Sequence, residues 1–231
     1  MPEAAHPSAA EICPTLPIPA PGAEQIHRAL GYPRDAAPAP AMEKRIAGIA
    51  AEALPLLQPR GVYALYPVSS STAHALQLDA LTVSGNIGEY LRDAERVAVF
   101  VVTVGEEISR MAAAAGKHGD AFSAWVVDAL GSWAAEAAAQ ALMLRLRPHL
   151  QPHQALTLRY SPGYCGMEMS QQRQLFRLAP AKAVGVTLLP SLLMHPLKSI
   201  SGLVGLAPES AIQQYRSPCD LCPRFGCPMR R

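Results

Sequence analysis

The sequence Arg159-Tyr160-Ser161-Pro162-Gly163-Tyr164-Cys165-Gly166 marks the end of a predicted strand and the tight turn that follows it. The strand is the short apolar run 155–158. Proline presets φ at one turn position, and glycine supplies the positive φ of the next position. The turn therefore presents Arg159, Tyr160 and Tyr164 at a strand end, where a guanidinium can bind a carboxylate through two parallel hydrogen bonds. An ordinary surface arginine beside a turn is the alternative.

The remaining pattern alternates between strands and helices. The run 96–104 is almost entirely apolar and β-branched, which predicts a central strand buried on both faces. Apolar periodicity and turn residues predict the other elements. We expect strands at 61–68 and 76–83, helices at 42–57, 120–147 and 170–179, a helical turn at 192–194, and apolar segments returning to the sheet at 183–188 and 199–206.

The segment 120–147 is the longest predicted helix and is long enough to span a membrane. However, Asp128, Ser132, Glu136 and Gln140 recur every four residues and form a polar seam on one face, which argues against a membrane span. Glu136 is of particular interest because a carboxylate on an apolar helix surface needs a partner. That partner is either the ammonium of a bound amino acid or a neighbour such as Gln140, with a solvated side chain as the other alternative.

The composition limits the class of protein. The chain has 231 residues, of which 50% are hydrophobic, and a net charge of +2, without a basic stripe that would indicate nucleic-acid binding. Five cysteines without a secretory signal indicate a reducing, cytoplasmic location. Nine of the 22 prolines fall within the first 40 residues, so we interpret residues 1–24 as an arm outside the core, with Cys13 as an inert thiol.

The last sixteen residues, 216–231, form a cysteine-rich tail. Cys219, Cys222 and Cys227 follow a Cys-x2-Cys-x4-Cys pattern, in which a tight turn can bring two thiolates together for zinc or an iron–sulfur cluster. Three ligands are one short of a closed tetrahedral site. A group of free or redox-exchanging thiols is the alternative, and we favour iron–sulfur slightly over zinc.

Two segments together resemble a known family. Arg-x-x-Pro-Gly-Tyr at 159–164, followed by Pro-x-x-Ser-x-Ser-Gly at 196–202, is similar to the activation domain of cobalamin-dependent methionine synthase, and the resemblance covers roughly residues 25–231. It implies an α+β fold, with a twisted, mainly antiparallel sheet packed against long helices. It also implies that residues 25–215 form the activation-like domain, and that the tail belongs to stand-alone members. Some of these members also carry a cysteine after Pro-Gly-Tyr, so the resemblance makes Cys165 the candidate for the fourth ligand of the tail.

The resemblance implies a function and a set of site residues. Such a protein binds S-adenosylmethionine and supports reductive methylation of a corrinoid carried by a partner methyltransferase, with an electron from a donor such as a flavodoxin or ferredoxin. Arg159 would hold the ligand carboxylate and Glu136 its ammonium, while the turn backbone, at Tyr160, Gly163 and Tyr164, would contact the ribose and adenine. No corrinoid-binding motif is present, so cobalamin must arrive on the partner. The alternative is a metal-binding adaptor or electron-transfer partner that does not bind S-adenosylmethionine.

Overall fold

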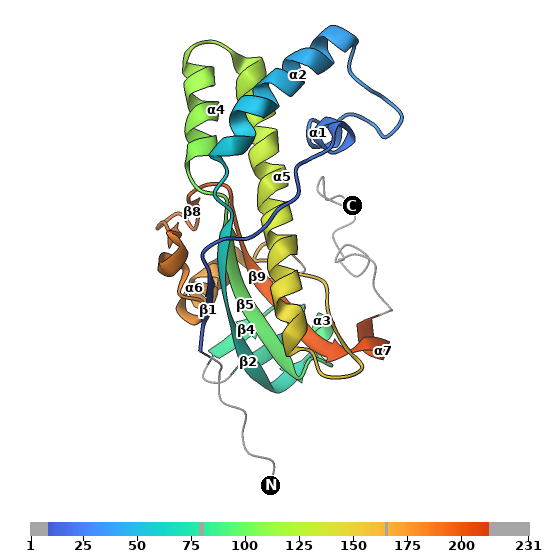
Figure 1. Cartoon of the computed structure of the whole chain (residues 1–231). Coiled ribbons are helices and arrows are strands. Elements are labelled where there is room, and N and C mark those ends of the chain that lie inside the picture. Colours follow the sequence, from blue (N-terminus) through green and yellow to red (C-terminus); the bar gives the residue numbers. More distant parts are fainter. Residues whose placement is uncertain (1–8, 79–80, 165, 213–231) are drawn as a thin grey trace.

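The valine-rich run at 96–104 forms the centre of the sheet, as predicted. Strand β5 (Arg96–Thr103) is buried along almost its whole length and pairs with β2 (Arg60–Thr72) on one side and β9 (Ser199–Pro208) on the other. The computed structural model describes residues 9–78, 81–164 and 166–212. The strand order within them is β4-β3-β2-β5-β9-β6, every pair is antiparallel, and the sheet curls around its helices (Figure 1). The predicted α+β class with an antiparallel sheet is confirmed.

The shorter elements complete the sheet and its cover. The remaining strands are β1 (Glu11–Cys13), β3 (Ala75–Leu78), β4 (Leu81–Ser84), β6 (Gln154–Leu156), β7 (Thr187–Leu188) and β8 (Met194–His195). The helices are α1 (Ala23–Ala29), α2 (Pro40–Ala53), α3 (Ile87–Tyr90), α4 (Glu107–Lys117), α5 (Ala121–Leu146), α6 (Gln172–Leu178) and α7 (Glu209–Ile212), with single 3₁₀ turns at Leu54–Leu56, Arg147–His149, Met169–Gln171 and Ala181–Val184.

The sheet has a hydrophobic core on each face because its central strands are apolar at successive positions. On one face, Tyr63 and Phe100 pack with helices α1, α2 and α5. On the other face, Val99 and Leu203 pack with α3, α6 and the β3–β4 hairpin. The candidate site lies where the first of these layers meets the sheet edge.

Helix α5 runs the length of the molecule beside the sheet (Figure 1). Asp120 caps it, accepting a hydrogen bond from the Ser123 amide at 3.0 Å, and six of its thirteen buried residues are alanines. The four residues of the predicted polar seam are all at least partly exposed, so the helix between 120 and 147 was predicted with its correct polar face. No helix in the described part of the chain is long and apolar enough to cross a membrane.

The N-terminal segment packs more closely than the sequence predicted. Strand β1 pairs with β2, and the side chains of Cys13 and Leu16 are 5% and 1% exposed. The Leu16 amide also donates to the carbonyl of Pro59 at 2.8 Å. The interpretation of residues 1–24 as an arm outside the core is therefore wrong for 11–16, because pairing with β2 satisfies this backbone. Burial raises the pKa of the Cys13 thiol, in keeping with an inert thiol.

The segment between α6 and β9 also differs from the prediction. Residues 183–188 do not return to the main sheet, because β7 pairs only with β8 in a separate two-stranded sheet. The expected helical turn at 192–194 is absent from this part of the described chain: residues 192–193 lie in the hairpin turn between these strands and Met194 begins β8. In the turn, Leu192 has a φ of 69° and its amide donates to the carbonyl of Leu189. Only 199–206 joins the main sheet as expected, within β9.

Candidate functional site

The turn at 161–164 has the predicted geometry. The Tyr164 amide donates to the carbonyl of Ser161 at 3.1 Å, and Gly163 between them has a φ of 93°. A Cβ on Gly163 would also lie 2.9 Å from the sulfur of Met169, but this exposed side chain can move, so it is the positive φ that requires glycine. The turn redirects the chain away from the sheet edge.

The two segments that carry the family resemblance lie side by side. Tyr160 and Leu203 exchange two backbone hydrogen bonds of 2.9 and 2.8 Å, which joins the extended segment after β6 to β9 as an isolated bridge. The approach is close at Gly202, where a Cβ would come within 2.6 Å of the Tyr160 carbonyl oxygen. The glycine that ends the Pro-x-x-Ser-x-Ser-Gly run thus allows the strand bearing Arg159 to reach the sheet.

Arg159 and Glu136, which the sequence analysis identified separately, form an ion pair. Nη2 of Arg159 donates to Oε2 of Glu136 at 2.9 Å, and the two side chains are 27% and 51% exposed. Glu136 comes from the polar seam of α5 and Arg159 from the sheet edge, so the pair bridges the helix and the strand. Because both charged side chains remain accessible to solvent, a ligand can reach each of them.

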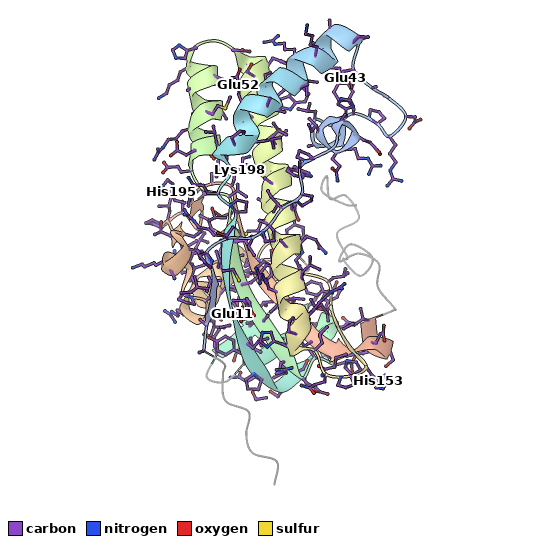
Figure 2. All side chains as sticks on the ribbon, viewed as in Figure 1. Glu11, Glu43, Glu52, His153, His195 and Lys198 are labelled. Carbon is purple, nitrogen blue, oxygen red and sulfur yellow. The ribbon has the colours of Figure 1, made fainter. Side chains whose placement is uncertain are left out.

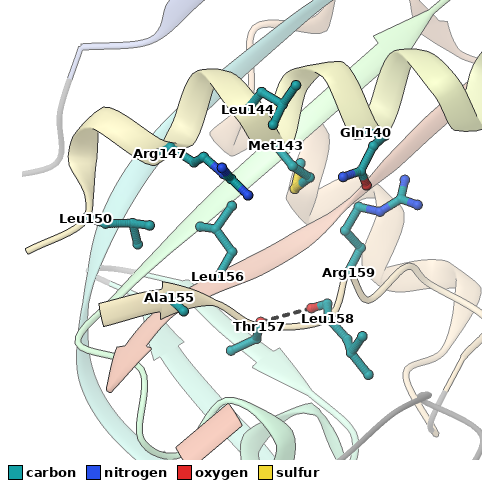
Figure 3. A pocket seen from close by; sticks show the side chains of 10 residues that line it. All are labelled: Gln140, Met143, Leu144, Arg147, Leu150, Ala155, Leu156, Thr157, Leu158 and Arg159. Carbon is teal, nitrogen blue, oxygen red and sulfur yellow. Dashed lines mark hydrogen bonds between the residues drawn. The ribbon is translucent and has the colours of Figure 1, made fainter. Parts of the chain in front are cut away.

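A groove lies beside this pair, between α5 and the strand that precedes the turn (Figure 3). Its volume is about 570 Å³. We call it the α5–β6 groove. Its lining consists of Gln140, Met143, Leu144, Arg147, Leu150, Ala155, Leu156, Thr157, Leu158 and Arg159. The walls are mainly aliphatic, an arginine lies toward each end, and none of these described lining residues carries a carboxylate.

The other predicted site residues are placed less favourably. Tyr160 is 2% exposed, and its ring lies against that of Tyr90 at a centroid distance of 5.0 Å, in the core on the opposite sheet face. The side chain of Tyr160 therefore belongs to that core, and the expected contact between the turn backbone and the nucleoside stays a prediction. Gly163 and Tyr164 are exposed on the turn but do not line the groove. Cys165 and the tail cysteines Cys219, Cys222 and Cys227 lie outside the described residues.

Comparison with known proteins identifies the family. The family model described as "Vitamin B12 dependent methionine synthase, activation domain" matches residues 87–216, which is more than half of the chain. The chain belongs to this family. The matched range includes both segments of the activation domain described above, and Glu136 with them. The predicted family membership is confirmed.

A solved structure supports the same fold. The activation domain is similar to the chain in "Crystal Structure of the MetH Reactivation Domain bound to AdoHcy", with a TM-score of 0.56 and 21% sequence identity. The match covers 77% of this chain and 67% of that chain. At this level of identity the likeness establishes the fold. A search of curated proteins found no match.

Sequence analysis missed one buried cation of the activation domain. Lys198, in the Pro-x-x-Ser run, is labelled in Figure 2. Its side chain is only 11% exposed, and its Nζ contacts Asp128 at 2.7 Å and Ser132 at 2.9 Å. Its aliphatic stem lies over Gly131, where a Cβ would approach its Cγ to 3.1 Å. The seam itself was the available signal, since an acidic residue and a serine one turn apart can share one lysine. Lys198 and Arg159 together fix the polar face of α5 to the sheet.

A second polar cluster of the activation domain lies at β1. The Tyr63 hydroxyl donates to Oε2 of Glu11 at 2.6 Å and lies 2.8 Å from Nε2 of His149. Burial, and then the hydrogen bond to Glu11, raise the pKa of Tyr63 well above its usual value, so the phenol stays protonated. The cluster holds β1 to the sheet and does not face the α5–β6 groove.

Proposed function

We propose that the chain binds S-adenosylmethionine and supports reductive methylation of a corrinoid on a partner methyltransferase. The Arg159–Glu136 pair carries this proposal. A guanidinium and a carboxylate within hydrogen-bond distance match the carboxylate and ammonium of an α-amino acid, because each protein charge can exchange its partner for the opposite charge of the ligand. The family, and the AdoHcy bound in the similar solved structure, support the same ligand class.

The chemical role of the chain would be to position the methyl donor. A reduced corrinoid supplies its own nucleophile, so the transfer needs no general base from this protein. Arg159 and Glu136 would fix the amino-acid end of the ligand and thereby direct the sulfonium methyl toward the partner's cofactor. The partner is proposed to be a corrinoid-binding methyltransferase such as methionine synthase, with a flavodoxin or ferredoxin as the electron donor.

A metal or cluster is proposed at the cysteine tail. Its support is the spacing of Cys219, Cys222 and Cys227, with Cys165 as a fourth ligand. Metal analysis and absorbance near 400 nm on anaerobically purified protein would distinguish an iron–sulfur cluster from zinc or free thiols. Protein without bound metal, with all four thiols reactive, would contradict this part of the proposal.

The test of ligand binding is calorimetric titration of S-adenosylmethionine into wild type and Arg159→Ala. We expect the substitution to abolish measurable binding. Arg45→Ala is a matched control, because Arg45 also forms a half-exposed ion pair with an acidic residue beside α5, at 3.0 Å from Asp120 and away from the groove. A wild-type protein that does not bind the ligand while its tail holds metal would instead support the metal-binding adaptor.

A double substitution makes the test sharper. Glu136→Arg combined with Arg159→Glu keeps opposite charges at the two positions but reverses their order. The amino-acid end would then have to bind in the opposite orientation, so we expect binding to be lost although the pair is restored. Full binding by this variant would contradict the assigned roles.

A further inference from the structure

Two cations on the sheet side reach the polar seam of α5, and the proposed ligand would displace one of them. Arg159 donates to Glu136 at 2.9 Å. Lys198 contacts Asp128 at 2.7 Å and Ser132 at 2.9 Å. Within the described residues, these are the two ion pairs that join the seam to the sheet. A ligand that takes over Arg159 and Glu136 opens the first pair, so Lys198 remains as the charged anchor of the helix.

Lys198 is well fixed for this task. It immediately precedes β9, and its carbonyl accepts hydrogen bonds from the Val104 amide at 3.1 Å and the Thr103 hydroxyl at 3.4 Å. Its side chain is 11% exposed, and its stem crosses Gly131, where a Cβ would lie 3.1 Å from Cγ and 3.2 Å from Cε. The end of β5 therefore holds the backbone of this residue, and the middle of α5 holds its ammonium group.

The apolar face of α5 defines the position of the helix less sharply than these polar contacts do. Six of its thirteen buried residues are alanines, whose short side chains form shallow ridges against the sheet. Hydrophobic burial is also non-directional. Charge-assisted hydrogen bonds, in contrast, have preferred distances and angles. The contacts of Lys198 therefore restrict how far α5 can slide or rotate on the sheet.

We propose that Lys198 is a positioning residue for the ligand site. It holds α5 in place while the ligand separates Arg159 from Glu136, so that the two side chains stay at the spacing that an α-amino acid spans. Ser132 and Glu136 are one helical turn apart, so a displacement of the helix at Ser132 also displaces Glu136. This inference rests on the proposed function, because it assigns a role toward the same ligand.

The test is a double-mutant cycle, measured by calorimetric titration of S-adenosylmethionine. The proteins are wild type, Lys198→Met, Glu136→Ala and the double variant. Methionine retains the apolar stem over Gly131 and removes the ammonium group. We expect Lys198→Met to weaken binding about fivefold, at the low end of the coupling between two sites, with unchanged stoichiometry. In the Glu136→Ala background, Lys198→Met should have no further effect, because no carboxylate is left to position.

Two further variants support the cycle. Asp128→Asn weakens the Lys198 contact from the helix side, and because the Asp128 side chain is 56% exposed, the fold should tolerate this change. We expect it to weaken binding about twofold. Arg110→Met is the matched control, since Arg110 also forms ion pairs with acidic residues, at 2.7 and 2.6 Å, but within α4 and away from the seam. It should bind with wild-type affinity.

The outcomes separate this inference from the proposed function. If Lys198→Met and Asp128→Asn both bind with wild-type affinity, the positioning role is overturned while the proposed function stands. An equal effect of Lys198→Met with and without Glu136 would show that it does not act through that carboxylate, and would also overturn the role. A fall in stoichiometry alone would assign Lys198 to folding only. If wild type does not bind S-adenosylmethionine, the proposed function itself fails, and this inference fails with it.

Discussion

Gly202→Ala should destabilise the protein by closing the space through which the Arg159 strand reaches the sheet. The new Cβ would lie 2.6 Å from the Tyr160 carbonyl oxygen and 3.1 Å from the Phe100 ring. The carbonyl belongs to the backbone and cannot rotate away as a side chain can. Either β9 or the segment 159–160 must therefore move.

The magnitude follows from two contributions. Overpacking a close contact costs about 1–3 kcal/mol. Movement of 159–160 would also weaken the two hydrogen bonds between Tyr160 and Leu203, each worth about 1 kcal/mol net. We expect a loss of about 3 kcal/mol in the free energy of unfolding, which for a chain of this size lowers the melting temperature by about 6–12 °C.

The assay is thermal and urea unfolding, with Gly48→Ala as the matched control. Gly48 lies exposed in the middle of α2, and a Cβ there would meet nothing within 4 Å. That substitution should stabilise the protein by about 0.5–1 kcal/mol, because alanine is the better helix former. If Gly202→Ala unfolds at the wild-type temperature while Gly48→Ala shows its gain, the close approach does not constrain the fold and the reasoning is refuted.

Three further predictions concern the polar contacts. Lys198→Met retains the buried stem but loses the contacts to Asp128 and Ser132, and should lower the free energy of unfolding by about 1 kcal/mol in urea titrations; no change would show that the ion pair contributes nothing. The raised pKa of Tyr63 means that the unfolded chain releases this proton first, so stability should fall as pH rises above about 10. Tyr63→Phe should remove most of that fall, and an equal fall in both proteins would contradict the assignment. Arg159→Ala should change the free energy of unfolding by less than about 1 kcal/mol, because the pair with Glu136 is partly exposed; a larger loss, measured in the same titrations, would mean that impaired binding reflects misfolding.

The elements with strong local patterns were predictable. Strand β5 is apolar at almost every position, and α5 shows its polar face every four residues, so both were identified from the sequence alone. The turn at 161–164 was predictable because proline and glycine have specific backbone preferences. Strand β1, with only three residues in a proline-rich context, has no such pattern, and its order depends on pairing with β2.

The site was predictable in part. Arg159 and Glu136 were found individually, but their contact joins residues that are 23 positions apart and depends on how α5 lies on the sheet. The burial of Tyr160 could have been anticipated, because neighbouring side chains in an extended strand point to opposite faces. Once Arg159 faces α5, Tyr160 must face the other core. The α5–β6 groove could not be anticipated, since it exists only after helix and strand are packed together.

The exposure of the ion pair has a consequence for selectivity. A partly exposed pair contributes little to stability, so a zwitterion that takes over both partners breaks a weak contact and forms two in its place. The same exchange is open to every α-amino acid, and the pair alone therefore cannot select a nucleoside sulfonium. Selection must come from contacts farther along the groove, where Arg147 and the outer edge of β6 lie. The ratio of affinities for S-adenosylmethionine and free methionine measures that contribution directly, and a ratio near one would mean that the groove beyond Arg159 takes no part in binding.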